Sequence, residues 1–529
     1  MSGAHEWIRQ WMTVYQDHHG YYVLPLLGIG LVGLRYLLSR EDLTRRMRPS
    51  LVRTARATLV GALVATALFS ILVYANFFNY HYGGYLNAYE FFHYYLGSKY
   101  SEEVGYFDMY GATLAADGET GRIYWPEDGE ITDLRSNLHV PVEQLLRDEP
   151  RYRSLFSPER WREWVGDVFY FKNRMGSRAW NRILHDRGYN ATPAWTMIVG
   201  GGLSRRIPTS NETGMTALAL LDVLLLAAAV ACVAWAFGVW PALLMIVLLA
   251  SSYLMAHVHM KGAFLRTDFV VCLIAAVCLL KKKRHALAGA LVGYSTMSRL
   301  FPAAFLFGPL AKLAWESRRR GVRIDPRHVR FFGGFALVVV VLIIASTIYS
   351  GGIAVWSDFA TKISLHRGDY HQWNVGLPSV VVAEFVGDQA LLPDGAVEDH
   401  ALTIRLIQLA GLLLCFFAVR GLDDHRALAF GFVPTFFLVA PTYYYFIVLL
   451  VPFLFLAERM TRAPAALGVA YLFLFGLMGH WLYQRWEQYF TTYYWNSVLA
   501  LILALYMLAL AFLETGRKES SPTATTAAP

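Results

Sequence analysis

Apolar stretches long enough to cross a membrane recur along most of this chain. A helix needs roughly 20 apolar residues to span the hydrocarbon core of a bilayer. Only 16% of the 529 residues are charged, whereas ordinary soluble domains carry about 25%. The chain is therefore predicted to be an all-α polytopic membrane protein. Its apolar stretches are 21–38, 59–78, 215–237, 243–256, 269–280, 331–349, 401–419, 428–440, 446–456, 464–483 and 497–513.

The net charge of +8 does not indicate a nucleic-acid partner, because the basic residues stand in short loops between apolar stretches. That placement is typical of the cytoplasmic loops of membrane proteins. The clearest markers are 281–284, which reads Lys-Lys-Lys-Arg, and 318–320, which reads Arg-Arg-Arg. All four cysteines lie inside apolar stretches, so neither disulfides nor a cysteine metal site is predicted.

The basic markers predict a topology of about 13 transmembrane helices with the N-terminus outside the cytoplasm. Residues 79–213 contain no stretch of spanning length and are predicted to form one large external loop, and 350–400 form a second. Residues 285–315 connect two cytoplasmic markers, so we expect a short or broken helical hairpin with Arg299 at its outer tip. The predicted divisions are N-terminal helices at 1–78, the large loop at 79–213, a transmembrane bundle at 214–515 and a disordered tail at 516–529.

The large loop is rich in tryptophan and tyrosine. Its segment 158–184 mixes aromatic and basic residues at helix-like spacing, which predicts interfacial helices lying on the outer membrane surface. A small packed ectodomain is the alternative interpretation of the same residues. Asn190 begins an Asn-Ala-Thr match to the N-glycosylation pattern, a short motif that is common by chance.

An acidic residue near the start of the large loop is the leading candidate for chemistry. Ionisable residues at the membrane boundary are costly and are functional candidates by default. Glu90, His93 and Tyr94 share one helix face through their i, i+3, i+4 spacing. A carboxylate held against aromatic rings near lipid has a raised pKa, which suits a general base. The alternative is a snorkelling interfacial helix without chemistry. Asp108 is a second candidate base.

Three outward-facing groups of cations are candidates for binding an anion. Lys261 and Arg266 precede Asp268 in a short external connection and suit a lipid headgroup or a substrate phosphate. Arg299 needs an anionic partner, either a structural carboxylate or a lipid-linked phosphate. The third group is either the wall of a site or an ordinary solvated loop, and it consists of Lys362, His366, Arg367 and Asn374.

Signatures of soluble enzymes are missing from the sequence. It contains no P-loop, no GxGxxG after a strand, no nucleophile elbow and no HExxH. ATP-driven transport therefore has no support. His257 and His259 could share a metal only on a strand, and they stand in a loop beside helices, so no metal site is predicted.

Four stretches carry a resemblance to known proteins. They are 90–95 (Glu-Phe-Phe-His-Tyr-Tyr), the glycine-rich 289–302 ending in Arg299-Leu-Phe-Pro302, 374–377 (Asn-Val-Gly-Leu) and 441–445 (Pro-Thr-Tyr-Tyr-Tyr). In this order they resemble the GT-C glycosyltransferases, multi-spanning enzymes that use polyprenyl-phosphate-linked sugars. Within that superfamily the chain is similar to the bacterial polyprenol-phosphate-mannose-dependent mannosyltransferase-like family.

The resemblance implies inverting transfer of mannose, or of another hexose or pentose, from a polyprenyl-phosphate donor. The acceptor would be a lipid, a glycan or a protein on the non-cytoplasmic face of the plasma (inner) membrane. Glu90 or Asp108 would act as general base, and the donor phosphate would meet Arg299, Lys362, Arg367, Arg266 and Lys261. Substrate-binding residues would include His93, Tyr94, His366, Asn374 and Tyr444. No cofactor is predicted, with a divalent metal as the open alternative.

Other functions fit parts of the same pattern. Asn87 stands where the family usually has an aspartate, which leaves the identity of the base open. A transporter or flippase of a lipid-linked or anionic substrate would use the same outward cations without chemistry. Inverted repeats would favour that alternative, and no convincing internal repeat is visible. Polysaccharide polymerases and ligases usually place their large external loop later in the chain.

Overall fold

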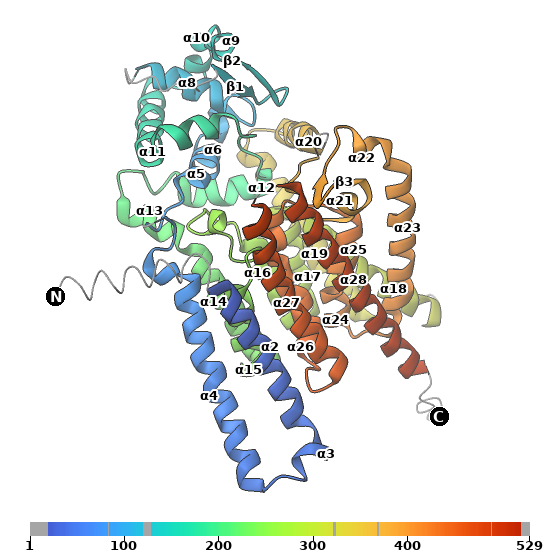
Figure 1. Ribbon diagram of the computed structural model, residues 1–529. Coiled ribbons are helices and arrows are strands. Elements are labelled where there is room, and N and C mark those ends of the chain that lie inside the picture. The colour runs from blue at the N-terminus through green and yellow to red at the C-terminus, as the bar shows by residue number, and fades with distance from the viewer. Residues whose placement is uncertain are drawn as a thin grey trace, which may run out of the picture.

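Nearly all the regular structure of this protein is helical, as its computed structural model shows. The described residues are 20–82, 84–119, 129–320, 324–367, 370–487 and 489–519. A helical bundle carries a smaller helical domain at one end, and the turn helix α3 (Glu41–Thr44) lies at the other end (Figure 1). The all-α prediction is confirmed at this level. Two short antiparallel hairpins interrupt it, β1 (Glu130–Asp133) with β2 (Leu138–Pro141) and β3 (Glu384–Val386) with β4 (Gln389–Leu391).

Seven helices in the described part of the chain are long and apolar enough to cross a membrane. Each overlaps an apolar stretch of the sequence, so the chain is a membrane-associated helical protein. They are α2 (Gly20–Ser39), α4 (Pro49–Tyr74), α13 with α14 (Glu212–Phe237), α19 (Pro326–Tyr349), α23 with η7 (Ala401–Gly421), α27 (Ala463–Trp486) and most of α28 (Phe490–Gly516).

The other expected crossings are shorter helices, so helices of spanning length do not reproduce the predicted count of about 13. A 14-residue helix is about 21 Å long, against roughly 30 Å for the hydrocarbon core. Protein surrounds several of them, because α16 and α26 are almost wholly buried. These helices are α15 (Val239–Ser251), α16 (Asp268–Lys281), α17 (His285–Ser298), α18 (Phe307–Arg320), α24 (Asp424–Ala429), α25 (Phe432–Leu438) and α26 (Leu450–Ala457).

The hairpin of α17 and α18 is broken at the predicted position. Arg299 follows α17 with an extended backbone (φ −141°, ψ 132°), and the short helix η6 (Phe301–Leu306) leads into α18. Helix α17 presses closely on α19, because a Cβ on Gly289 would lie 1.8 Å from the carbonyl oxygen of Phe331. Small residues allow such close helix approach inside membranes. This crossing fixes the first half of α17 against α19, and Arg299 follows the other end of the same helix.

The large loop folds into a domain with its own hydrophobic core. Its main elements are α8 (Met109–Glu119), α10 (Glu149–Ser154) and α11 (Pro158–Leu184). Trp164 and Trp180 of α11 have no exposed surface, so their rings contact protein instead of lipid. The burial of these rings therefore favours the packed-ectodomain alternative for 158–184. The domain is called the ectodomain below, after the predicted topology.

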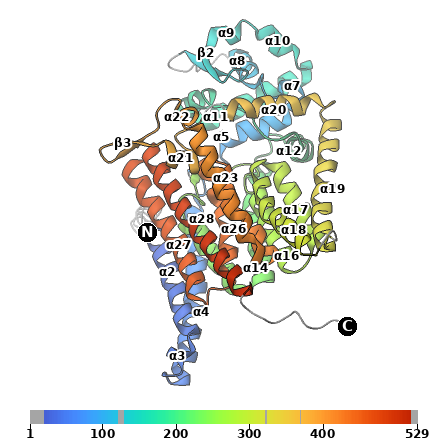
Figure 2. The same cartoon turned by 90° about the vertical axis from the view of Figure 1, so that its right-hand side faces the viewer.

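Two further segments lie at the edges of the bundle. Helix α20 (Ala354–Arg367), from the second predicted loop, runs across the bundle beneath the ectodomain (Figure 2). Helix α28 continues from Phe490 to Glu519. The prediction of a disordered tail from 516 is therefore wrong for 516–519, which belong to this helix. The remaining residues of the predicted tail, 520–529, lie outside the described part of the chain.

Candidate functional site

Glu90 is presented by a short helix whose start is tied to a neighbouring loop. Helix α5 (Ala88–Phe91) begins after Asn87, whose side-chain oxygen accepts the Glu90 backbone N–H at 3.2 Å. The Asn87 amide group donates to the carbonyl of His259 at 2.7 Å, and the Asn87 backbone N–H donates to Gly262 at 2.9 Å. Asn87 is therefore the helix cap that fixes Glu90 beside the 257–266 loop.

Helix α5 continues into the π-helical turn η3 (Phe92–Leu96), which separates the three residues predicted to share a face. Glu90 and Tyr94 both reach Arg266, whereas His93 bonds through Nε2 to the Tyr110 hydroxyl at 2.8 Å. Because the Tyr110 hydroxyl donates to a backbone carbonyl, His93 is the donor of this bond. Burial lowers the pKa of His93 to about 4, so its ring is neutral at pH 7 and ties the ectodomain core together.

Arg266 is the cation nearest to Glu90. Its Nε lies 3.2 Å from Glu90 Oε2, and its guanidinium group stacks over the Tyr94 ring at 4.1 Å. Burial raises the pKa of the Glu90 carboxyl, and the charge of Arg266 opposes that rise. The Nε and Nη1 atoms of Arg266 are buried without a hydrogen-bond partner among the described residues, and so is Glu90 Oε2. Buried groups of this kind need a hydrogen-bond partner, which a water molecule or a ligand can supply.

Arg299 approaches the same tyrosine from the end of α17. Its guanidinium carbon lies 5.6 Å from the Tyr94 ring centre and 5.4 Å from that of Trp195. Nη1 donates to the Ser298 carbonyl at 2.9 Å, while Nε and Nη2 are buried without a partner in the described chain. Two buried arginines therefore flank one aromatic ring and keep hydrogen-bond donors free.

Two aspartates hold the residues beside the arginines without forming ion pairs with their guanidinium groups. The Asp222 carboxylate accepts the backbone N–H groups of Arg266 and Thr267, both at 2.9 Å. Asp268 accepts the hydroxyl of Ser298, next to Arg299, at 2.7 Å. Asp222 lies inside the apolar stretch 215–237 and was not among the predicted site residues. A lone carboxylate in a spanning stretch was the signal that could have identified it.

A tyrosine turn closes another side of the site. The rings of Tyr444 and Tyr445 lie 5.7 and 5.6 Å from the Arg266 guanidinium carbon. Asn374 supports this turn, because it forms an isolated antiparallel bridge with Thr442. The predicted substrate-binding residues Asn374 and Tyr444 thus meet at the site, one through its backbone and the other through its ring.

A second carboxylate, Asp186, lies near the centre and was not predicted. It accepts the Tyr89 hydroxyl at 3.0 Å, and its charge contributes to the raised pKa of Glu90. Its side chain is 42% exposed, so it is more accessible to solvent than Glu90 is. The polar run that contains it, 185–190, directly follows the aromatic helix α11 and was the signal available in the sequence.

Tyr94 connects the centre to α20 through Asn190. The Tyr94 hydroxyl donates to Asn190 Oδ1 at 2.7 Å, and Asn190 Nδ2 donates to His366 Nε2 at 3.3 Å. His366 Nδ1 carries its proton, because it donates to the Lys362 carbonyl at 2.8 Å. Burial lowers the pKa of His366 to about 4, which keeps this acceptor neutral. The Asn190 amide group is therefore engaged within the site.

The second candidate base, Asp108, belongs to a different environment. Its two oxygens accept bonds from Arg135 at 2.8 and 2.9 Å and from Arg151 at 2.9 Å. These arginines neutralise the carboxylate within the ectodomain. The structure does not bring Asp108 to the arginines that flank Tyr94.

The remaining predicted cations also lie apart from that group. Lys362 is fully buried and donates to the Leu134 carbonyl at 3.2 Å, so it ties α20 to the ectodomain. Lys261 lies over the Tyr74 ring at 5.0 Å, and burial lowers its pKa to about 7. The Arg367 side chain lies outside the described part of the structure.

Within the described ranges, no group of three or more His, Cys, Asp or Glu side chains is placed to hold a metal ion. Comparisons with protein-family models, curated proteins and solved structures found no match to this chain. The candidate site is therefore defined by its geometry, with Glu90, Arg266, Arg299 and Tyr94 at its centre.

Proposed function

We propose that this chain is an integral membrane glycosyltransferase that moves a sugar from a polyprenyl-phosphate donor to a lipid, glycan or protein acceptor. One observation carries the proposal: buried Arg266 and Arg299 flank Tyr94 with free guanidinium N–H groups, beside the buried carboxylate of Glu90. A phosphate supplies the acceptor oxygens that these donors lack. Arginine suits this role because its planar fork matches phosphate geometry.

The arginines and the Glu90 carboxylate have separate roles in the proposed reaction. The acceptor hydroxyl oxygen attacks the anomeric carbon as the bond from that carbon to the phosphate oxygen breaks, which inverts the configuration. The electron pair of the broken bond stays on the lipid phosphate, where Arg266 and Arg299 stabilise the added charge. The hydroxyl proton passes to Glu90, whose raised pKa suits proton uptake.

Donor binding would also change the state of Glu90. In the unliganded site Arg266 is the nearest charge partner of that carboxylate. A phosphate that engages Arg266 weakens this partnership and brings a second negative charge close by. Both effects raise the proton affinity of Glu90 when the donor is in place.

We further propose that the site faces the periplasmic or extracellular side of the plasma membrane. The basic stretches 281–284 and 318–320 mark the cytoplasmic side. The short helices would supply the remaining crossings of the predicted 13, since irregular and short segments are tolerated where protein surrounds them. The polyprenyl tail would lie between helices, open to lipid.

Transfer by purified protein tests the proposal. The full chain in lipid nanodiscs would receive labelled polyprenyl-phosphate sugars and a lipid extract as acceptor. We expect the wild type to form labelled product and Glu90→Gln to lose about 10²–10⁴-fold in rate, the usual contribution of a general base. Asp108→Asn is the matched control and should stay active, because Asp108 is paired with Arg135 and Arg151.

Two outcomes would contradict the proposal. Donor binding without product in the wild type would favour the transporter or flippase alternative, in which the arginines bind an anion without chemistry. Full activity of Glu90→Gln would remove Glu90 as the base, and Asp186→Asn would then be the next variant, because Asp186 is the other acid near the centre.

A further inference from the structure

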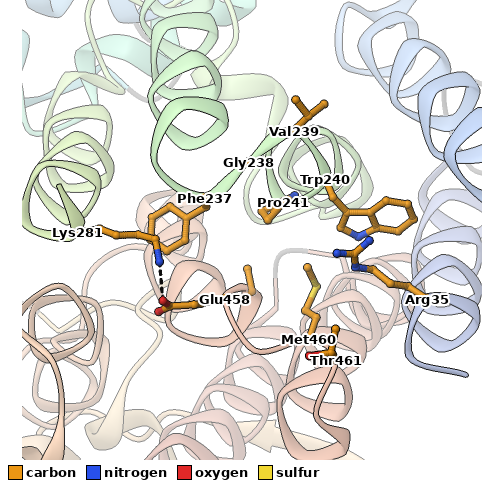
Figure 3. Close-up of a pocket in the computed structure, with 11 residues that line it drawn as sticks. Arg35, Phe237, Gly238, Val239, Trp240, Pro241, Lys281, Glu458, Met460 and Thr461 are labelled. Atoms are coloured by element: carbon orange, nitrogen blue, oxygen red, sulfur yellow. Dashed lines mark hydrogen bonds and ion pairs between the residues drawn. The ribbon is translucent and has the colours of Figure 1, made fainter. Parts of the chain in front are cut away.

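A cavity of about 340 Å³ lies at the end of the bundle opposite the ectodomain. It sits between α2, the turn that joins α14 to α15, the end of α16 and the turn that joins α26 to α27 (Figure 3). The residues that matter for its chemistry are Arg35, Trp240, Lys281, Glu458, Met460 and Thr461. Its size is within the range of small-molecule sites in proteins, about 300–1,000 Å³.

Arg35 gives this cavity an unbalanced positive charge. Its guanidinium carbon lies 4.3 Å from the Trp240 ring centre, and no described residue forms an ion pair with it. Its Nε is buried without a hydrogen-bond partner in the described chain, and the same holds for the Trp240 Nε1 atom. Figure 3 shows the two side chains stacked at one side of the cavity.

The one carboxylate among the lining residues is already matched. Glu458 accepts from Lys281 at 2.5 Å and pairs with His425 at 2.7 Å. The negative charge of Glu458 therefore interacts with these two partners and does not balance the charge of Arg35. The start of α15 adds to the positive potential, because Gly238 caps the helix without a side-chain bond to its first N–H groups.

Exposed apolar side chains stand on the helices and the turn that form the cavity. Leu34 on α2 is 53% exposed, Trp235 on α14 is 52% exposed and Val239 at its rim is 66% exposed. A cationic cavity beside exposed apolar helix faces fits a molecule with a phosphate and an acyl chain. The nearby turn also carries exposed Arg46 and Arg48, a distribution typical of the leaflet that holds anionic lipids.

We infer that this cavity binds the phosphate of an anionic phospholipid, which enters from the adjoining leaflet and fastens α2 to the bundle. Arg35 and the Trp240 N–H would donate to the phosphate oxygens, Thr461 lies on the same side of the cavity as Arg35, and Lys281 lies across it (Figure 3). A free phosphate ion has the same oxygen chemistry but would make no use of the apolar rim. The lipid bridges α2 to segments far away in the sequence.

Native mass spectrometry of the full chain in detergent can test this inference. Phosphatidylglycerol, phosphatidylcholine and inorganic phosphate would be titrated separately. We expect one saturable phosphatidylglycerol adduct, bound about tenfold more tightly than phosphatidylcholine, and roughly tenfold weaker in Arg35→Gln, which corresponds to about 1.4 kcal/mol. Arg48→Gln, an exposed arginine outside the cavity, is the matched control and should bind as the wild type does.

Arg35→Lys keeps the charge and stem if Arg35→Gln fails to fold, and it should still bind several-fold more weakly because lysine lacks the planar fork. Wild-type affinity in Arg35→Lys would overturn the inference. So would equal losses in Arg35→Gln and Arg48→Gln, which would indicate general attraction to a basic surface. Displacement of the adduct by millimolar inorganic phosphate, with no preference among lipids, would identify a free-anion site instead.

Discussion

Glu90 and Arg266 form a buried pair in which neither partner is fully satisfied. The Nε to Oε2 distance is 3.2 Å, yet both atoms lack a hydrogen bond among the described residues. A buried ion pair repays its desolvation only when its remaining hydrogen-bonding groups find partners. The pair is therefore better suited to receiving a polar ligand than to stabilising the empty site.

Replacing Arg266 should change the pH dependence of transfer in a defined direction. Burial raises the pKa of Glu90 and Arg266 lowers it, so Arg266→Gln removes the lowering influence. Glu90 then loses its proton only at higher pH. We expect the acidic limb of kcat/KM to move upward by about one pH unit or more, the usual effect of an adjacent arginine.

Profiles of kcat/KM against pH check this expectation. Arg299→Gln should move the limb in the same direction but less, because Arg299 has a smaller influence on Glu90. Arg135→Gln removes an exposed partner of Asp108 and should leave the limb in place. An acidic limb that stays fixed in Arg266→Gln would show that Glu90 is not the titrating base.

Some of the site could be predicted from the sequence and some could not. The spacing of Glu90 and Tyr94 indicated a shared face, and both residues do reach Arg266. His93 does not point toward Arg266, because the π-helical turn changes the register of the helix after Phe91. Asp222 escaped prediction because its partners lie 44 and 45 residues away, and only the packing of α14 beside the 257–266 loop brings them together.

At the scale of elements, α17 packs tightly against α19 and carries Arg299 after its far end. A Cβ on Gly289 would lie 1.8 Å from the Phe331 carbonyl oxygen, a backbone atom that cannot move alone. Gly289→Ala should therefore push the helices apart and destabilise the protein by about 1–3 kcal/mol, as overpacking does elsewhere. The displaced α17 should also weaken donor binding.

Thermal unfolding in detergent measures the first effect. Gly333→Ala is the matched control on α19, because no atom lies within 4 Å of its added Cβ. Alanine is favoured over glycine inside a helix by roughly 0.5–1 kcal/mol, so this variant should be neutral or slightly stabilised. Equal Tm values for the two variants would contradict a tight crossing at Gly289.

The sequence predicted where helices form more reliably than it predicted what surrounds each helix. The seven long helices lie where apolar stretches of spanning length were recognised. The short helices carry the same apolar signal, but their environment depends on neighbours that a local pattern does not encode. Helix α11 illustrates this limit, because Trp164 and Trp180 read equally well as lipid anchors or as core residues.

At the scale of the whole molecule, the ectodomain and the bundle are joined through α20. Lys362 of α20 is fully buried and donates to the Leu134 carbonyl in the turn between β1 and β2. Burial is the main cause that lowers the pKa of Lys362 from 10.5 to about 8, and nearby Arg187 adds to it. Between pH of about 8 and 10.5 the Lys362 amine is therefore mostly neutral in the folded protein, whereas it keeps its proton in the unfolded chain.

This preference predicts how stability depends on pH. Between pH of about 8 and 10.5 the unfolded state binds one more proton at Lys362 than the folded state does. Stability rises with pH wherever the unfolded state binds more protons. The free energy of unfolding should therefore contain a contribution from Lys362 that increases across this window and is complete above it.

Lys362→Met should remove that contribution while it keeps an apolar stem of similar length at the joint. Unfolding curves of wild type and variant, collected from pH 7 to about 10.5 in the same detergent, give the difference directly. Lys282→Met, at an exposed lysine near the opposite end of the bundle, should leave the wild-type slope unchanged. Parallel curves for the wild type and Lys362→Met would mean that the joint holds Lys362 charged, with its proton retained on folding.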